Sequence, residues 1–164
     1  MFPFEHLVVI WIVASIIQKV SKIKISRLGW ALLFFGALLP DVDYLFVWIF
    51  NSPIHRTFTH SFVFVILGFF VSYFILKQYK LEKESIFFSI GFFSHVILDM
   101  FIFPGLMLFW PIGTLFSFYG LTNLFVMPVV TIGTLHLYVK WLLFDIVLGV
   151  VWLSYLYFKG KINF

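Results

Sequence analysis

Long apolar runs separated by short polar segments dominate the chain. The runs are Leu7–Ile17, Leu28–Phe50, Ser61–Leu76, Ser85–Phe103, Leu121–Val139 and Trp141–Phe158. A helix that spans a bilayer needs about 20 apolar residues, and several of these runs are shorter. The ten-residue alternation of a membrane barrel does not occur. The pattern predicts an all-α integral membrane protein, a compact bundle of five to six transmembrane helices. A re-entrant segment within residues 104–133 is an alternative to the sixth span.

Composition supports the membrane assignment. Of the 164 residues, 63% are hydrophobic and 11% are charged, whereas a soluble domain is about half apolar and a quarter charged. A soluble fold of this size could not bury 25 Phe and 6 Trp residues. We expect one membrane-embedded domain over residues 1–164, in the inner (cytoplasmic) membrane of a cell. Because the chain has no cysteine, thiolate metal sites and cysteine nucleophiles are excluded.

Basic residues gather at three places that predict the orientation in the membrane. They follow the first run (residues 19–27), separate the third run from the fourth (residues 77–83) and end the chain (residues 159–161). The positive-inside rule places these clusters in the cytoplasm and the N-terminus outside. Five spans keep the last cluster cytoplasmic and six do not, so we favour five.

A few ionisable side chains interrupt the apolar runs, where such groups are costly and usually functional. Helical rise from the basic clusters places those of the second and fourth runs about 20 Å from the cytoplasmic boundary. The others lie near the outer ends of their runs. The His and Asp candidates at this common depth, facing the outer leaflet, are His6, Asp41, Asp43, His55, His60, His95 and Asp99.

Two of these motifs have spacings that suit a metal site. His95 and Asp99 are four residues apart, so a helix presents both on one face, where they can share a cation or form a hydrogen-bonded pair. Asp41 and Asp43 would face different sides of a regular helix. Pro40 predicts a break that turns both toward one cavity, the alternative being a kink with Asp41 as a helix cap.

The third motif is the segment His55-Arg-Thr-Phe-Thr-His60-Ser61, which combines two imidazoles, a guanidinium and three hydroxyls. Arg56 offers a planar fork for phosphate; the alternative is a polar loop in which Ser61 or Thr59 caps the next helix. Three structural pairings would have to coincide at one depth, so we favour metal binding. Nitrogen and oxygen ligands suit Zn²⁺, with Mn²⁺ or Fe²⁺ as alternatives. Seven candidates exceed the four ligands of one zinc, which indicates one or two ions per chain, the second about 3.5–4 Å from the first.

The segments LPDVDY, HRTFTHS, SHVILD and FWP, with His6 near the start, resemble the inner-membrane metal-dependent hydrolases called YdjM-like. The pattern is more distantly similar to zinc-dependent phospholipase C and S1/P1-type nucleases. That resemblance implies one metal held by Asp41, His55, His95 and Asp99. It implies His6 and a bridging Asp99 for a second metal, and Asp43 and His60 as further ligands or general base.

We therefore expect a metal-dependent phosphoester hydrolase, with Arg56 binding a phosphate oxygen and with Asp43 and His60 as further catalytic residues. A lipid or lipid-linked phosphoester is the expected substrate because the walls are apolar. Nucleic acid is not expected, because Arg56 is the only basic residue in the predicted outer loops. The alternatives are an ion or metal transporter and a non-catalytic, metal-stabilised adaptor. A further polar set, His136, Lys140 and Asp145, is interpreted as interfacial or helix-pairing.

Overall fold

The computed structural model describes residues 3–50, 55–101, 105–113 and 135–160. Every regular element within them is helical, which confirms the all-α prediction. The elements are α1 (Pro3–Ser21), α2 (Arg27–Leu38), the 3-10 helix η1 (Leu39–Val42), α3 (Asp43–Phe50), η2 (Phe58–His60), α4 (Phe62–Lys77), η3 (Glu82–Glu84), α5 (Ser85–Asp99) and α6 (Leu135–Phe158). Most of the predicted run 121–139 and of the predicted re-entrant stretch lies outside the described residues.

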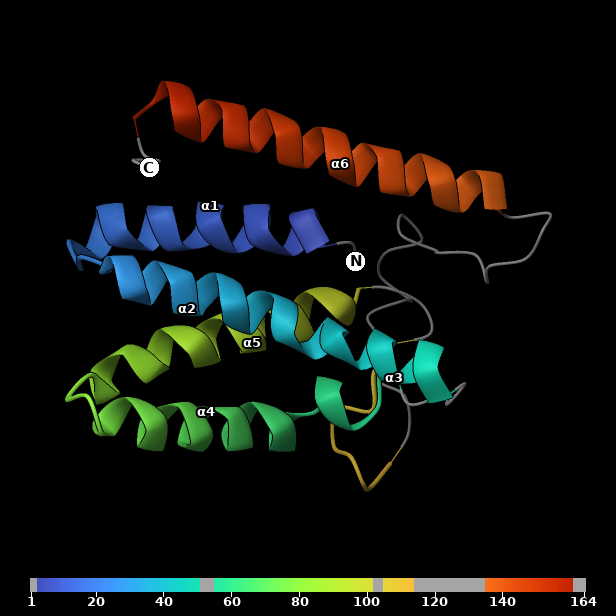
Figure 1. Cartoon of the computed structure of the whole chain (residues 1–164), viewed down its shortest axis with the longest axis horizontal. Helices are drawn as coiled ribbons and strands as arrows, with labels where there is room; N and C mark the ends of the chain where they lie inside the picture. Colours follow the sequence, from blue (N-terminus) through green and yellow to red (C-terminus); the bar gives the residue numbers. More distant parts are fainter. Residues whose placement is uncertain (1–2, 51–54, 102–104, 114–134, 161–164) are drawn as a thin grey trace.

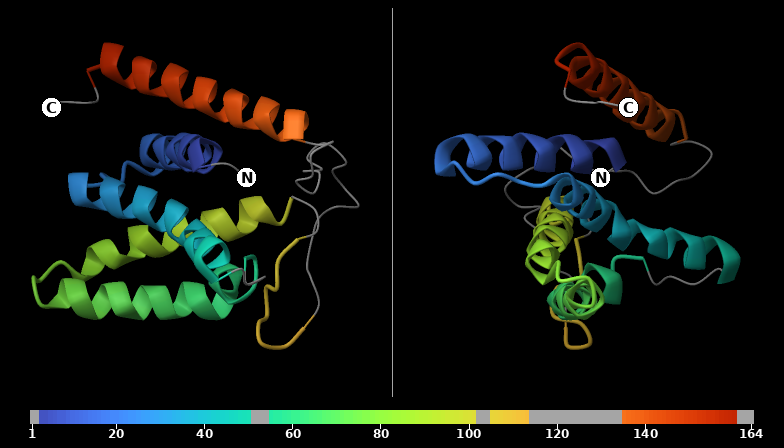
Figure 2. Two further views of the ribbon diagram at one scale, coloured as in Figure 1. Left: turned by 45° about the vertical axis from the view of Figure 1, so that its right-hand side comes forward. Right: turned by 60° about the vertical axis from the view of Figure 1, so that its left-hand side comes forward.

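The long helices of the described residues, α1, α2, α4, α5 and α6, lie side by side, and their direction alternates in chain order (Figure 1). Helices α1, α4 and α6 run one way, and α2 and α5 run the other. Helix α5 packs on α2 and α4, while α1 packs on α2 and α6, so α6 forms one flank of the bundle in both turned views (Figure 2). The direction of α6 is the one that five spans require, because its C-terminus lies beside the α1–α2 and α4–α5 connections. The number of spans stays a prediction.

Within the described residues, three helical stretches are long and apolar enough to cross a membrane: Pro3–Ser21, Arg27–Val47 and Val139–Phe158. Helix α4 is apolar but shorter. Large apolar side chains cover the outward surfaces of these helices, as Val147 and Val151 do on α6, each about 60% exposed. A lipid environment accepts this surface and water does not. The chain is therefore a membrane protein.

The two central helices, α2 and α5, touch along their backbones. A Cβ atom on Gly36 would lie 2.1 Å from the Phe88 carbonyl oxygen, and one on Gly91 would lie 2.0 Å from that of Leu33. Only glycine permits so close an approach, a common device between membrane helices. The buried side chains of Leu33 and Phe88 continue the contact toward the basic end of the bundle. The bundle is thus closely packed between its basic end and the polar residues at the opposite end.

The predicted break at Pro40 is confirmed. Helix α2 ends at Leu38, the turn of 3-10 helix holds Pro40 near its start, and α3 begins at Asp43. Proline lacks the amide hydrogen that a continuous helix would use, and its fixed φ suits the first turn of a new one. The break brings Asp41 and Asp43 to different atoms of one side chain, His60.

Candidate metal centre

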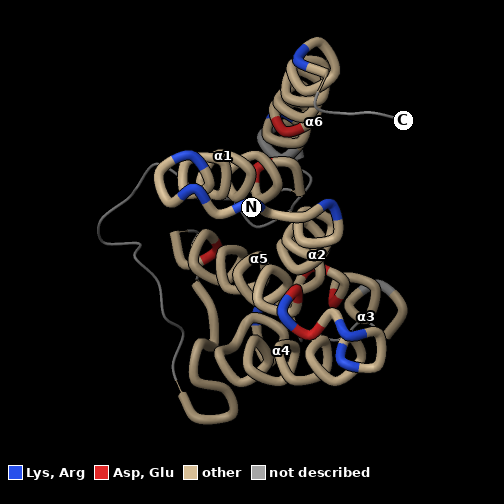
Figure 3. Tube along the Cα trace, turned by 90° about the vertical axis from the view of Figure 1, so that its left-hand side faces the viewer, with Lys and Arg blue, Asp and Glu red and all other residues tan. Residues whose placement is uncertain are grey.

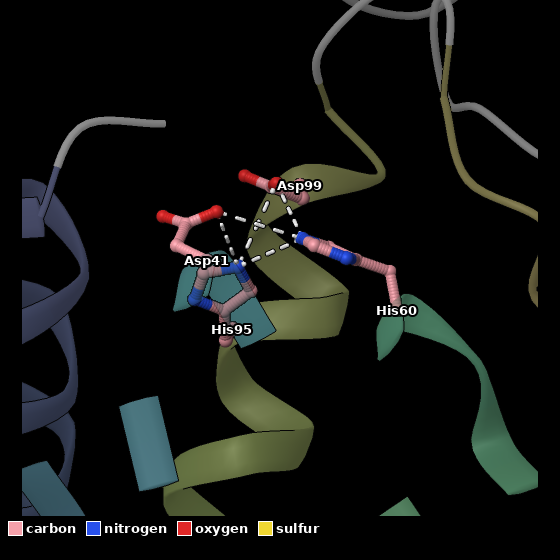
Figure 4. Close-up of side chains that lie close together, drawn as sticks. All are labelled: Asp41, His60, His95 and Asp99. Atoms are coloured by element: carbon pink, nitrogen blue, oxygen red, sulfur yellow. Dashed lines mark hydrogen bonds and ion pairs between the residues drawn. The ribbon is translucent and has the colours of Figure 1, made fainter. Parts of the chain in front are cut away.

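Four side chains converge at the end of the bundle opposite the basic clusters (Figure 4). Asp41 comes from η1, His60 from η2, and His95 and Asp99 from α5. The Nε2 atoms of His60 and His95 lie 3.2 Å apart. Each lies 3.6 Å from Asp41 Oδ1, and their distances to Asp99 Oδ2 are 3.6 and 3.7 Å. The predicted pairing of His95 with Asp99 on one helix face is confirmed.

These five spacings match edges of a small tetrahedron, and the sixth, between the two carboxylate oxygens, is at most 4.8 Å. Zinc binds nitrogen and oxygen ligands at about 2.0–2.2 Å, which in tetrahedral geometry places the ligand atoms about 3.3–3.6 Å from one another. The four atoms can therefore hold one transition-metal ion without a large rearrangement. Three of the residues are at most 1% exposed, and Asp41 is 15% exposed. The cluster is buried except on the side of Asp41.

The His95 ring is oriented by the backbone of α2. Its Nδ1–H donates to the Ala37 carbonyl oxygen at 2.6 Å, because that carbonyl has no hydrogen to offer. The tautomer that results leaves the Nε2 lone pair directed at the cluster. A metal-binding histidine usually donates its other ring N–H to an oxygen atom in this way.

The His60 ring is oriented by a polar chain. Its Nδ1–H donates to Thr59 Oγ1 at 3.0 Å, and the Thr59 hydroxyl donates to Asp43 Oδ2 at 2.5 Å. Burial disfavours the charged imidazole, but hydrogen bonding to Asp41 and Asp43 outweighs burial and raises the pKa of His60 above its usual value. The surroundings of His60 therefore favour a positive charge, which a proton or a metal ion can supply.

His55 lies outside the four-residue cluster and contacts it through Asp43. Its Nδ1–H donates to Asp43 Oδ1 at 2.8 Å, and its ring packs against the Tyr44 ring at a tilt of 31°. The Nε2 atom is buried and has no hydrogen-bond partner. The resemblance implied His55 as a ligand beside Asp41, but the structure places His60 in that position. Asp43, His55 and His60 form a second group of metal-ligand spacing. A neutral His60 has one lone pair and can serve only one group.

His6 approaches the cluster from α1. Its ring stacks on His95 with centroids 3.8 Å apart, and its Nε2 lies 3.4 Å from Asp99 Oδ1. The side chain is fully buried, yet neither ring nitrogen has a hydrogen-bond partner. Buried polar atoms seldom stay unsatisfied without an ion or water nearby. Asp99 thus faces His6 with one oxygen and the four-residue cluster with the other, and its role as a bridge between two metal ions stays a prediction.

Arg56 completes the outer side of the site. Its Nε lies 4.0 Å from Asp99 Oδ2, and its backbone adopts a positive φ of 64°. The Arg56 carbonyl accepts from Met107 N–H, and Leu108 accepts from Phe62 N–H. The segment 105–113 is therefore bonded across the loop that carries Arg56 and His60. Ser61 caps α4 by accepting from Phe64 N–H, so the loop both caps a helix and supplies the cluster.

Helix α6 contributes one polar residue that acts at a distance from the cluster. Asp145 is 2% exposed, and its carboxylate accepts from the backbone N–H groups of Phe4 and Glu5, at 3.2 and 2.8 Å. A carboxylate at the start of α1 satisfies free amides and complements the helix dipole. The helix-pairing interpretation of Asp145 is confirmed, while His136 and Lys140 are exposed. The sequence could not identify the partner, because backbone amides leave no signature in it.

Membrane-length helices around a buried cluster of His and Asp side chains define a membrane protein with a candidate metal centre. The sequence matches the family described as YdjM inner membrane protein over residues 1–162, and the chain belongs to that family. The resemblance drawn from the motifs is thus confirmed at the level of the family. Neither the search of curated proteins nor that of solved structures gave a match.

Proposed function

We propose that the protein is a membrane-embedded, metal-dependent hydrolase that cleaves a phosphoester of a lipid from the outer-leaflet side. The observation that carries the proposal is the set of four ligand atoms around His60 and His95. Both Nε2 atoms lie 3.2–3.7 Å from each other and from the two carboxylate oxygens, and both imidazoles are held by outer hydrogen bonds. Among the described residues, a second position is offered by two protein atoms, His6 Nε2 and Asp99 Oδ1. Such a position leaves room for water or substrate, as catalytic metal sites do.

A metal ion bound here would lower the pKa of a coordinated water and neutralise phosphoryl charge. Asp41, His60 and His95 would hold it, and Asp99 would face both positions. Arg56 lies beside Asp99 and can donate to a phosphate oxygen through its planar guanidinium. These roles keep the predicted metal ligands except for His55, which His60 replaces.

The pair of Asp43 and His55 fits the role of general base. Asp43 accepts the Nδ1 hydrogen of His55, which leaves the lone pair on Nε2. An imidazole held by a carboxylate in this way takes and returns protons in many hydrolases. The His55 and His60 rings lie 5.1 Å apart, so a proton acceptor at His55 is adjacent to the cluster. Asp43 is then a positioning residue that orients both histidines.

The surroundings favour a lipid over a soluble polyanion. The outer end of α3 exposes Ile49 and Phe50, and the 105–113 segment exposes Phe109 and Ile112. Arg56 and Lys140 are the basic side chains toward this end within the described residues, too few for a nucleic-acid surface. Acyl or isoprenoid chains can contact such walls while the phosphate reaches Arg56.

A non-catalytic role for the metal is the second candidate. Four protein ligands complete a tetrahedral site, which is the usual arrangement of a structural zinc. A transporter is less consistent with the packing, since the α2 and α5 backbones touch at Gly36 and Gly91 below the cluster. Turnover distinguishes a hydrolase from a metal-stabilised adaptor, whereas metal content does not.

The deciding experiment is a competition assay in micelles with purified, metal-replete protein. Short-chain phospholipid and lipid phosphate should be cleaved faster than single-stranded DNA or soluble phosphate esters. His55→Gln should lower kcat by about 100-fold or more, the usual contribution of a general base, and leave metal content unchanged. Full metal occupancy without turnover of any phosphoester would favour the adaptor, and nucleic-acid cleavage without lipid turnover would refute the lipid substrate.

A further inference from the structure

A cavity of about 870 Å³ lies between α1, α2 and α6, in the half of the bundle away from the His/Asp cluster. Its walls are aromatic, with Trp11 on α1, Trp30 and Phe34 on α2, and Trp152 on α6. Lys19 and Arg27 also line it, near the ends of their helices. Binding sites for small molecules have volumes of about 300–1,000 Å³, so the cavity can hold a substantial part of a lipid.

The polar side of the cavity is positively charged. Lys19 and Arg27 are exposed, and neither forms an ion pair with an acidic side chain in the described parts of the chain. Figure 3, which views this end of the bundle, shows Lys and Arg on α1, at the start of α2 and at the α4–α5 side, and the acidic residues at this end lie mainly at the α4–α5 side. A site with two uncompensated cations fits an anionic group.

The wall of the cavity contains an unsatisfied donor. Trp152 is 8% exposed, and its Nε1–H has no hydrogen-bond partner. Indole nitrogen is a donor only, and a buried tryptophan usually finds an acceptor. Helical rise places Trp152 about 10 Å further into the bundle than Lys159, which follows the end of α6. An acceptor for its Nε1–H would therefore lie deeper than the helix ends that carry Lys19 and Arg27.

The helix packing leaves a place for this ligand. Helix α6 makes its main contacts with α1, whereas α2 packs on α1 and α5. Trp152 reaches toward α2 through an edge contact with Phe34, at 5.8 Å between ring centroids. The cavity separates α6 from α2 on the side of Lys19 and Arg27. Because membrane-length helices surround it, lipid is the molecule that most readily reaches it.

We propose that this cavity binds one anionic phospholipid of the surrounding leaflet. The phosphate pairs with Lys19 and Arg27, a glycerol-ester oxygen accepts from Trp152 Nε1–H, and an acyl chain lies along Trp11 and Phe34. Basic pockets between membrane helices on the cytoplasmic side are known to bind acidic headgroups. The bound lipid stabilises the contact of α6 with the rest of the bundle, independently of any chemistry at the His/Asp cluster.

The test is a lipid titration of the detergent-purified full chain, followed by native mass spectrometry. Short-chain phosphatidylglycerol and phosphatidylcholine are the two probes. The wild-type chain should bind one phosphatidylglycerol at least tenfold more tightly than phosphatidylcholine. The K19Q/R27Q double variant should bind phosphatidylglycerol about 30-fold more weakly, since each basic side chain near an acidic lipid surface contributes about fivefold. Both positions are exposed, so folding should be preserved.

Two further variants separate this site from general surface charge. K77Q/K83Q removes two exposed cations at the same end that do not line the cavity and should bind phosphatidylglycerol like the wild type. Trp152→Phe keeps an aromatic wall but removes the donor, and should weaken both lipids by about two- to tenfold. Equal losses in the two double variants, or unchanged binding in K19Q/R27Q, would overturn the proposal. The proposal would also be overturned if inorganic phosphate, at the same concentration as the lipid, displaced phosphatidylglycerol from the chain. The same holds if the cavity is occupied by a second copy of the chain, which the lipid displaces.

Discussion

The Nε2 atoms of His60 and His95 lie 3.2 Å apart, although 35 residues separate them in the chain. The Nδ1 atom of His95 is engaged by Ala37, and that of His60 by Thr59. Both Nε2 lone pairs are therefore directed at the same small volume, which also receives the oxygens of Asp41 and Asp99. Two lone pairs and two carboxylates repel one another unless a cation lies between them.

Protein purified in detergent without a chelator should carry one to two transition-metal ions per chain. His60→Asn should remove the ion held by the four-residue cluster, because its Nε2 is a corner of the tetrahedron. His55→Asn is the matched control and should retain that ion, since His55 contacts Asp43 and not the cluster. Elemental analysis measures both. Loss of metal in His55→Asn with retention in His60→Asn would restore the ligand set that the distant likeness to phospholipase C and S1/P1-type nucleases implied.

Asp99→Asn should abolish turnover and reduce the metal content to at most one ion. The substitution keeps the shape of the side chain but removes the negative charge that faces His6 on one side and His60 on the other. His136→Ala is the control on the exposed start of α6 and should keep most of the activity. Similar losses in both variants, with lowered melting temperatures, would indicate general destabilisation.

Asp145→Asn should lower the free energy of unfolding by about 1.5–3 kcal/mol, the range of hydrogen bonds to a charged group. Asp145 holds the first turn of α1, and His6 belongs to that turn. The variant should therefore lose metal from the His6 position first and keep the ion at the four-residue cluster. Val147→Ala, an exposed change on the same helix, is the control. Metal titration with thermal melting tests this, and simultaneous loss of both ions would contradict it.

Reporter fusions should place Lys80 and the C-terminus in the cytoplasm, and a tag in the loop 51–57 outside. The reason is the concentration of basic residues at one end of the bundle (Figure 3) and the positive-inside rule. An external C-terminus with a cytoplasmic Lys80 would require an additional crossing between α5 and α6. A cytoplasmic loop 51–57 would invert the bundle and bring the His/Asp cluster to the inner leaflet.

Local rules in the sequence determined much of the site. A spacing of four residues places His95 and Asp99 on one side of any helix, whatever surrounds it. Proline interrupts a helix because it lacks an amide hydrogen, so the break before Asp41 could be predicted without a structure. The excess of apolar residues likewise required a membrane, since no soluble core of this size could hold them.

The choice between His55 and His60 was made only by the tertiary structure. Both residues belong to one loop, and the sequence offers no reason to prefer either as a ligand. The loop forms backbone hydrogen bonds with the segment 105–113, and the Thr59 hydroxyl donates to Asp43. These contacts direct the His60 ring into the four-residue cluster and leave the His55 ring beside it. The hydrogen bond from the Glu5 N–H to the Asp145 carboxylate, 140 residues away in the chain, likewise depends on the tertiary structure. Spacing along a helix is fixed by its geometry, whereas contacts between distant segments depend on how the whole bundle packs.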